Sequence, residues 1–242
     1  MLFPTENIAF NYKVEAPFGH TIMPRVQGEK VEAPSGYTIM PRVQGKKVES
    51  MDKIIFLDRD GTINKEVEYL YCHSDLVLLP GVAEELKRLK DHGFKLVVVT
   101  NQAGVARGYY KEEDVVSLHG YLNSLLSEKG AEIDRFFYCP HHPVHGIGRY
   151  KIECSCRKPE TGMFEMAEAF FQVDKAHSYM IGDKILDTEA GRRYGVKGIL
   201  VGTGYGGELY EAMTGEEKKE SLDAYAPTMK EAVDWILTRE GE

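Results

Sequence analysis

Side chains that could carry out phosphoryl transfer follow several short apolar segments of this 242-residue sequence. The first group is Asp58-Arg59-Asp60-Gly61-Thr62, in which two carboxylates two positions apart on an extended segment point the same way. Further groups are Thr100 with Asn101, Arg157 with Lys158, and Asp183 with Lys184 and Asp187. If one crevice collects these side chains, it holds three or four carboxylates, two cations and a hydroxyl.

That inventory suits transfer of a phosphoryl group through an aspartyl phosphate. A carboxylate nucleophile approaches a phosphate dianion only when its charge is screened, and a hard divalent cation with oxygen ligands provides that screening. The cation expected here is a catalytic Mg²⁺. A second carboxyl must protonate the leaving alkoxide and later take a proton from water, which calls for a raised pKa. Asp60 is placed for this role, beside Asp58.

The elements that position these residues alternate between strand and helix patterns. Buried strands are expected at Ile54–Leu57, Leu96–Val99, Ile133–Tyr138, Tyr179–Ile181 and Ile199–Val201. Helices are expected at Val82–Asp91, Glu112–Ser127, Met163–Phe171 and Thr188–Tyr194, with a last one from Pro227-Thr228 to Leu237. The alternation predicts an α/β fold, a Rossmann-like parallel sheet with helices on both faces. Ligands of such sheets lie beyond the carboxyl ends of the strands, where the candidate residues stand.

A second constellation has the composition of a metal site. Cys139-Pro-His141 and Cys154-Ser-Cys156 supply three thiolates and an imidazole, the tetrahedral set that Zn²⁺ prefers. Four protein ligands leave no position for water, so the zinc would be structural and would fix the loop that leads into Arg157 and Lys158. His142 and His145 are alternative fourth ligands, and a disulfide or simple buried thiols are the alternatives to a metal. Cys72 is expected to be a core thiol.

The first 50 residues differ from the rest of the chain. Residues 14–30 and 31–47 are two copies of a 17-residue unit that differ at three positions. Two copies with two prolines and two glycines each do not make a stable solenoid. We expect residues 1–50 to be an irregular or β-ribbon extension without a catalytic role, with a dimer-forming segment as the alternative. The functional domain is expected to be 51–242.

Composition limits the partners. Thirty basic against 38 acidic residues give a formal charge of −8, which argues against binding of nucleic acid or an anionic membrane surface. No apolar run is long enough for a membrane span, and the N-terminal segment lacks the order of a secretory signal. We therefore expect a cytoplasmic protein, a monomer or weak oligomer, acting on a small substrate.

The motifs resemble the haloacid dehalogenase (HAD) superfamily phosphatases. DRDGT at 58–62, TN at 100–101, KP at 158–159 and GD...D at 182–187 match the four signature motifs in order, over roughly residues 53–204. The resemblance implies that Asp58 is the nucleophile and Asp60 the general acid and base. It also implies that Asp58, the backbone carbonyl of Asp60 and Asp183 hold magnesium. Thr100 and Asn101 would bind the phosphoryl group and Lys158 would neutralise it, while Asp187 either caps the next helix or supports the magnesium shell.

The spacing further predicts a capless enzyme, because only a helix and a strand fit between Thr62 and Thr100. A capless member with Cys-x-His...Cys-x-Cys before the third motif resembles the D-glycero-D-manno-heptose 1,7-bisphosphate 7-phosphatases, with histidinol-phosphatases as close relatives. The resemblance implies removal of the 7-phosphate from a phosphorylated sugar. The residues it places at the substrate are Asp58, Arg59, Asp60, Glu66, Val67, Glu68, Tyr69, Thr100, Asn101, Gln102, Ala103, Arg157, Lys158 and Lys184.

Three other functions stay open from the residues. Arg157 and Lys184 would be spare cations for the distal phosphate of a bisphosphate, whereas Glu66 and Glu68 would suit the amine of histidinol phosphate. A phospholigand-binding module without catalysis is the non-enzyme alternative. A nucleic-acid 3'-phosphatase is chemically possible, but the acidic balance counts against it.

Overall fold

A computed structural model describes residues 12–15, 38–41 and 51–241 of the chain. Its main sheet has the order β5-β4-β3-β6-β7-β8, and every neighbouring pair is parallel. The strands are β3 (Ile54–Leu57), β4 (Lys95–Asn101), β5 (Arg135–Cys139), β6 (Tyr179–Gly182), β7 (Lys197–Val201) and β8 (Ala224–Ala226). This confirms the predicted parallel α/β sheet.

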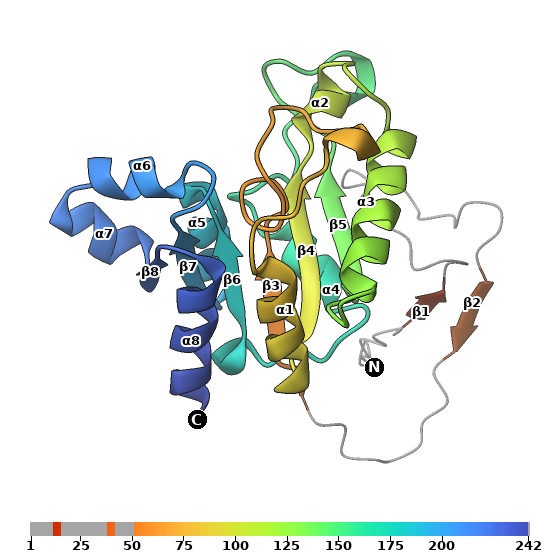
Figure 1. Cartoon of the computed structure of the whole chain (residues 1–242). Coiled ribbons are helices and arrows are strands. Elements are labelled where there is room, and N and C mark those ends of the chain that lie inside the picture. Colours follow the sequence, from red (N-terminus) through yellow and green to blue (C-terminus); the bar gives the residue numbers. More distant parts are fainter. Residues whose placement is uncertain (1–11, 16–37, 42–50, 242) are drawn as a thin grey trace, which may run out of the picture.

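Helices cover both faces of the sheet (Figure 1). They are α1 (Val82–Asp91), α2 (Ala103–Ala106), α3 (Glu112–Ser127), α4 (Gly162–Ala167), α5 (Ile185–Tyr194), α6 (Gly206–Ala212), α7 (Gly215–Ser221) and α8 (Met229–Glu240), with short 3₁₀ turns at His73–Asp75, Gly148–Tyr150 and Lys175–His177. Side chains alternate along a strand, so β3 feeds two cores. Ile55 and Leu57 pack with α1, α3 and α8, and Ile54 and Phe56 pack with α4 and α5.

The strand order places a switch point at β3, the central strand of the domain. The chain leaves β3 for β4 on one side, continues to β5, and then crosses to β6 on the other side of β3. Crevices at such a reversal are the usual ligand sites of open α/β sheets. Asp58 follows β3 directly, so the structure puts the first candidate carboxylate at that crevice.

The C-terminal third contains three elements that the sequence patterns did not predict. Helices α6 and α7 carry a single buried residue between them, Gly206, so they lack the apolar periodicity that marks a helix against a core. Strand β8 has three residues, too few for a recognisable alternation. Strand β3 and helices α1 and α3 have the predicted bounds, α2 was not predicted, and the remaining elements shift by a few residues; β4, for example, extends through Thr100 and Asn101.

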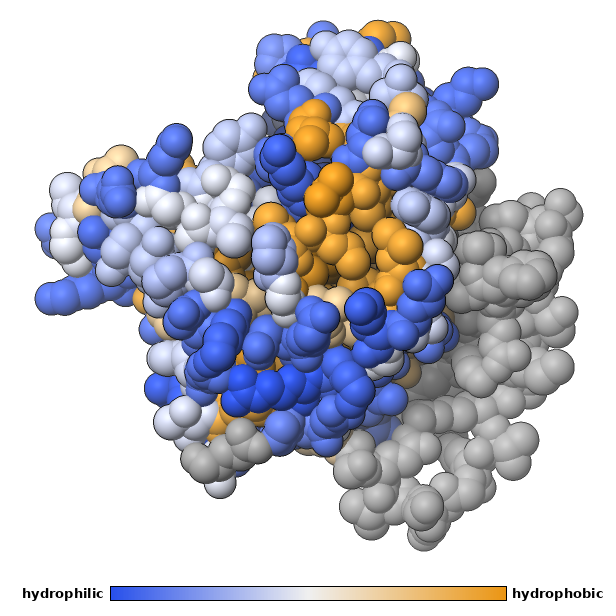
Figure 2. All heavy atoms as spheres, in the orientation of Figure 1, coloured by the Kyte–Doolittle hydropathy of each residue, from blue (hydrophilic) through white to orange (hydrophobic). Residues whose placement is uncertain are grey.

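The segment between Thr62 and Thr100 contains loops, α1 and most of β4, and it forms no separate cap domain. Of the duplicated region the structure describes only β1 (Tyr12–Glu15) and β2 (Thr38–Pro41), which pair antiparallel. The rest of it lies outside the described residues, and the boundary at Met51 stays a prediction. Figure 2 shows a mostly hydrophilic face, with hydrophobic residues gathered between α1 and α3. No helix within the described residues is long and apolar enough to cross a membrane.

Candidate active site

A polar cavity of about 300 Å³ lies at the carboxyl ends of the central strands. Twelve of the expected substrate-site residues line it: Asp58, Asp60, Glu66, Glu68, Tyr69, Thr100, Asn101, Gln102, Ala103, Arg157, Lys158 and Lys184. The other two do not. The side chain of Arg59 is fully buried behind the cavity, and Val67 is 40% exposed but lies outside the lining. The expectation that these two side chains contact substrate is therefore not supported by the structure.

Asp58 shares a buried cation with a second carboxylate. The Nζ atom of Lys158 lies 3.0 Å from Oδ1 of Asp58 and 2.7 Å from Oδ1 of Asp187, and it also donates to the Val99 carbonyl at 2.6 Å. Burial lowers the pKa of Lys158, but the charges of Asp187 and Asp58 outweigh it and raise that pKa above its usual value. Lys158 is therefore a permanent positive charge beside the nucleophile candidate.

Asn101 holds the main chain of Lys158 rather than pointing a free amide at the cavity. Its Oδ1 accepts from the Lys158 N–H at 3.0 Å, and its Nδ2 donates to the Lys158 carbonyl at 3.1 Å. The resemblance had implied that Asn101 binds the phosphoryl group. The structure gives its side chain another task, fixing the residue that neutralises that group.

Asp58 belongs to a cluster of three buried carboxylates. Ligand oxygens of Asp58, Asp183 and Asp187 all lie within 4.8 Å of one another. Burial and the charge of Asp58 raise the pKa of Asp183 to about 7. Burial also raises the pKa of Asp187 to about 6, although Lys158 opposes the shift. Such crowding favours either protonation or a cation, and oxygen ligands of this kind are those that Mg²⁺ prefers.

The chain leaves Asp183 space by placing glycines around it. A Cβ at Gly61 would lie 2.2 Å from Oδ2 of Asp183, and a Cβ at Gly204 would lie 2.1 Å from the same atom. Both glycines have positive φ. The hydroxyl of Thr203 donates to the Gly61 carbonyl at 2.6 Å, which ties the two segments together. Bare backbone therefore surrounds one side of this carboxylate.

Asp187 has two structural partners. Its Oδ2 accepts from the Lys184 N–H at 3.0 Å, which caps α5, while its Oδ1 faces Lys158. The sequence offered Asp187 as a cap of a helix that follows it, whereas α5 begins at Ile185 and Asp187, its third residue, caps it from within the first turn. The same carboxyl also belongs to the acidic cluster, so capping and support of a cation do not exclude each other here.

Hydrogen-bond donors surround the carboxylate of Asp60, and they overturn the expectation that its pKa is raised. Arg59 contacts both of its oxygens, at 2.6 Å and 2.9 Å, and the side-chain amides of Asn64 and Gln102 donate to it at 3.0 Å and 3.1 Å. Burial would raise the pKa of Asp60, but the Arg59 charge and these hydrogen bonds bring the pKa below its usual value. The raised pKa expected of a general acid is wrong for this arrangement, because the donors stabilise the carboxylate.

Both polar atoms of the Gln102 side-chain amide are hydrogen-bonded to other side chains. Its Nε2 donates to Asp60 and to the Thr100 hydroxyl, and its Oε1 accepts from the Tyr110 hydroxyl at 2.8 Å and from Arg59. Gln102 lines the cavity, but these partners show that it orients Asp60 and Thr100.

The two cations expected to be spare differ from each other. Lys184 lies 3.2 Å from Oε2 of Glu66 and 3.4 Å from Oδ1 of Asp183, so its charge is already paired. Arg157 donates to the His141 carbonyl at 3.1 Å and, within residues 51–241, has no carboxylate partner. Arg157 is thus the cation at the cavity that is left for a second anion.

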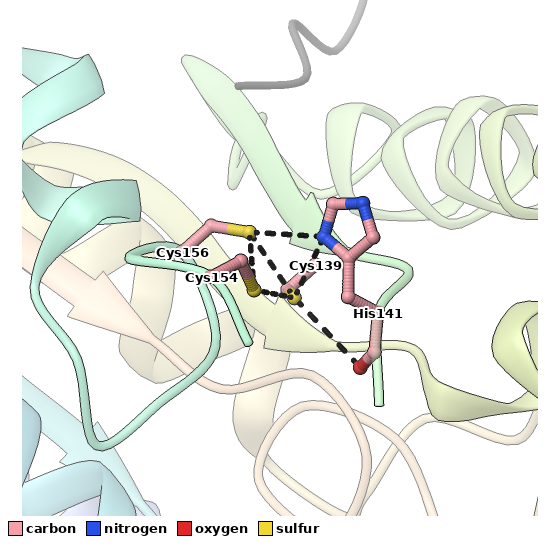
Figure 3. Close-up of side chains that lie close together, drawn as sticks. All are labelled: Cys139, His141, Cys154 and Cys156. Atoms are coloured by element: carbon pink, nitrogen blue, oxygen red, sulfur yellow. Dashed lines mark hydrogen bonds between the residues drawn. The ribbon is translucent and has the colours of Figure 1, made fainter. Parts of the chain in front are cut away.

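Three cysteines and a histidine converge at the end of β5 (Figure 3). Sulfur atoms of Cys139, Cys154 and Cys156 are 3.2–3.5 Å apart, and Nδ1 of His141 is 3.5 Å from the Cys156 sulfur and 3.8 Å from the Cys139 sulfur. Ligands of a tetrahedral zinc, at bond lengths of about 2.0–2.3 Å, are about 3.5–3.8 Å apart. All four cysteines are free, so the disulfide alternative is wrong. His142 instead accepts from the N–H groups of Val144 and His145.

Sequence reasoning missed three residues at the cavity and one behind it. Tyr205 lines the cavity and donates its N–H to Asp183 at 3.0 Å, and Tyr110 and Leu186 line it as well. Tyr205 lies at the edge of the stretch that matched the motifs, and Tyr110 could have been noticed only as an aromatic beside the TNQAGVARG segment. His119, behind Arg59, lies on the apolar face of α3, where no pattern distinguishes it.

The parallel sheet, the switch point and the carboxylates at β3 and β6 define a HAD-like hydrolase. The family model described as HAD-hydrolase-like matches residues 155–232, which include Lys158 and Asp183.

Similar proteins narrow the class. A D-glycero-beta-D-manno-heptose-1,7-bisphosphate 7-phosphatase from Vibrio cholerae is 46% identical over 151 residues, 62% of this chain and 81% of that protein. A D-glycero-alpha-D-manno-heptose-1,7-bisphosphate 7-phosphatase from Burkholderia mallei is 43% identical over 150 residues, 62% of this chain and 79% of that protein. The crystal structure of D,D-heptose 1,7-bisphosphate phosphatase from B. bronchiseptica, complexed with magnesium and phosphate, has a TM-score of 0.66 at 29% identity and covers 77% of this chain and 99% of that one. The chain belongs to the heptose-1,7-bisphosphate 7-phosphatase family of HAD-like hydrolases.

Proposed function

We propose that this protein is a magnesium-dependent phosphatase that removes the 7-phosphate of D-glycero-D-manno-heptose 1,7-bisphosphate and leaves the heptose 1-phosphate. The observation that carries the proposal is the buried Asp58, which lies at the switch point with Lys158 at 3.0 Å and two further carboxylates within 4.8 Å. Family membership supports the same substrate class.

Asp58 acts as the nucleophile in two balanced steps. A carboxylate oxygen of Asp58 attacks phosphorus, the bond between phosphorus and the sugar oxygen breaks, and that oxygen takes a proton from Asp60. Water then attacks the aspartyl phosphate and gives a proton to Asp60, which releases phosphate and restores both carboxyls. Lys158 neutralises the phosphoryl oxygens in each step, and the buried setting strengthens its effect.

The first step requires Asp60 to carry a proton. Since Arg59, Asn64 and Gln102 stabilise its carboxylate, the arrangement described here is that of the base in the second step. Substrate binding must therefore oppose this stabilisation through its own negative charge before the leaving oxygen can be protonated, while Arg59 continues to hold the carboxyl in place.

The acidic cluster fits a magnesium ion. Oxygen atoms of Asp58 and Asp183, with the Asp60 backbone carbonyl, would hold it, and Asp187 would support them. When bound, Mg²⁺ screens the carboxylate charges and polarises phosphoryl oxygens. Burial and the neighbouring carboxylates raise the pKa values of Asp183 and Asp187, and a bound cation would relieve that repulsion.

We propose a structural zinc for Cys139, His141, Cys154 and Cys156. The four ligand atoms lie within 4.8 Å of one another, three of the residues are cysteine, and no position is left for water. Arg157 donates to the His141 carbonyl, so zinc would fix the loop that presents this cation to the distal phosphate.

The nucleophile is tested with Asp58→Asn. We expect turnover to fall by roughly 10⁴-fold or more, because an amide cannot form the acyl phosphate. Asp234→Asn, a substitution of a surface carboxylate paired with Arg88, is the matched control and should keep full activity. Rapid quenching of the wild type should trap a phosphoryl group that mass spectrometry places on Asp58. Unimpaired hydrolysis by Asp58→Asn would remove the proposed mechanism.

The substrate is tested by parallel assays. Both anomers of heptose 1,7-bisphosphate, histidinol phosphate and a 3'-phosphorylated oligonucleotide are compared by kcat/KM. Glu66 is paired with Lys184, so Glu68 alone remains for the amine of histidinol phosphate, and we expect the heptose bisphosphate to be preferred at least about tenfold. A preference for histidinol phosphate would contradict the substrate assignment and leave the phosphatase chemistry intact.

A further inference from the structure

A histidine with no assigned role lies behind the acid–base carboxyl. His119 is on the buried face of α3 and is 3% exposed. Its ring stacks on Phe136 at a centroid distance of 4.7 Å and meets Tyr138 edge-on at 6.0 Å. Its Nε2 lies 3.3 Å from Nη1 of Arg59. A guanidinium only donates hydrogen bonds, so Nε2 must be the acceptor and the neutral ring carries its proton on Nδ1.

This contact gives the remaining nitrogen of the Arg59 guanidinium a partner. Nε and Nη2 of the guanidinium are engaged with Asp60, and Nη2 also reaches the Gln102 side chain and the Leu70 carbonyl. Within residues 51–241, the partner of Nη1 is Nε2 of His119. His119 therefore fixes the plane of the guanidinium from the side opposite Asp60.

The protein maintains this contact at a cost. Nδ1 of His119 is buried and has no partner among the described residues. A buried donor without a partner is unfavourable, and an apolar residue of the same shape would avoid the loss. Burial and the neighbouring Arg59 lower the pKa of His119 well below its usual value, which keeps the ring an acceptor. Core packing alone therefore does not account for a histidine at this position, whereas the contact with Arg59 does.

We propose that His119 is a positioning residue for the proton-transfer carboxyl: it holds Arg59, and Arg59 holds Asp60 at the cavity wall. The inference rests on the proposed function, in which Asp60 donates a proton to the leaving sugar oxygen. Because proton transfer requires close placement of the two oxygens, a looser Arg59 should slow departure of a poor leaving group and leave substrate binding unchanged.

The test compares two esters in His119→Phe, which keeps the aromatic stack and removes the acceptor. With the heptose bisphosphate, whose alkoxide needs a proton, we expect kcat to fall about tenfold and KM to stay within about twofold. With 4-nitrophenyl phosphate, whose leaving group departs without a proton, we expect the first-turnover release of 4-nitrophenol, which precedes the step in which Asp60 acts as a base, to stay within about twofold of wild type. His119→Gln, whose amide carbonyl can accept from Arg59, should recover most of the loss.

The matched control is His73→Phe. His73 stacks on Tyr121 and contacts the Ser117 hydroxyl at 3.0 Å, and both partners lie on α3, the helix that carries His119. These contacts do not involve Arg59 or Asp60. The substitution should affect the two esters alike. An equal loss of the first-turnover rate on both esters in His119→Phe, an unchanged kcat on the heptose bisphosphate, or no recovery in His119→Gln would overturn the inference.

A measurement on the wild type covers the case in which His119→Phe does not fold. Nitrogen NMR of labelled histidine should show His119 as the neutral tautomer protonated on Nδ1, and a ring protonated on Nε2 would overturn the inference. If wild type hydrolyses neither ester with Mg²⁺, the proposed function fails instead. Activity in wild type with no ester-dependent effect in the variant removes only the role of His119.

Discussion

The side-chain amide of Asn101 is bonded to both main-chain polar groups of Lys158, at 3.0 Å and 3.1 Å. Asn101 ends β4, and Lys158 lies 57 residues further along, just after the Cys/His cluster. The contact fixes a buried lysine whose ammonium group lies between Asp58 and Asp187. The last residue of a buried strand therefore holds the main chain of a loop residue in place.

Asn101→Ala should therefore impair catalysis more than folding. Loss of the two bonds frees the Lys158 backbone, and we expect kcat to drop roughly 10- to 100-fold through misplacement of its ammonium group. Asn123→Ala is a matched control, because Asn123 bonds both main-chain groups of Ile133 in the same way but far from the cavity. Both variants should lose a similar stability of roughly 1–3 kcal/mol in denaturant unfolding. Equal activities of the two variants would contradict the role of Asn101.

Cys154→Ser should reduce bound zinc and loosen the loop. We expect zinc, about one per chain in the wild type by elemental analysis, to fall sharply, with a loss of roughly 2 kcal/mol or more in stability. Cys72→Ser is the control, since Cys72 lies outside the cluster. Because Arg157 is bonded to the His141 carbonyl, the effect on activity should be a higher KM for the bisphosphate. Zinc-free wild-type protein with normal stability and KM would refute this prediction.

Magnesium binding should strengthen as pH rises. The pKa of Asp183 is about 7 and that of Asp187 about 6 in the metal-free protein, so protons occupy these carboxyls at lower pH and must leave when the cation binds. Below pH 7 each unit of pH should weaken the affinity by up to about tenfold per displaced proton, and above pH 8 the affinity should level off. Calorimetric titration with MgCl₂ at several pH values measures this. An affinity independent of pH between 5.5 and 8 would show that these carboxyls are already ionised.

Residues 51–242 alone should retain activity. The cavity and both clusters are built from residues between Asp58 and Tyr205, none of them in the duplicated segment. We expect kcat/KM within about twofold of the full chain. Sedimentation of both forms tests whether residues 1–50 form dimers, the alternative for this segment. Loss of turnover in a folded truncated protein would assign the segment a catalytic role.

The sequence was sufficient for five of the six strands of the sheet and for the position of Asp58, because buried β-branched runs and the residues that follow them are local signals. It was not sufficient for what the side chains contact. Arg59 reads as a cation available to substrate, yet it is buried against His119, 60 residues away. Lys184 reads as a spare cation, yet Glu66, 118 residues away, pairs with it. Such partners depend on packing between distant segments. The weakly apolar α6 and α7 were missed because they bury almost nothing.

Gly61 and Gly204 belong to segments more than 140 positions apart, and both approach the same oxygen of Asp183. This close approach should determine which substitutions are tolerated at these two positions. Even alanine at either codon would force a methyl carbon against a carboxylate oxygen, in a backbone conformation that side chains disfavour. In a saturation library selected for phosphatase activity, these two sites should accept glycine alone, although neither offers a functional group to the reaction.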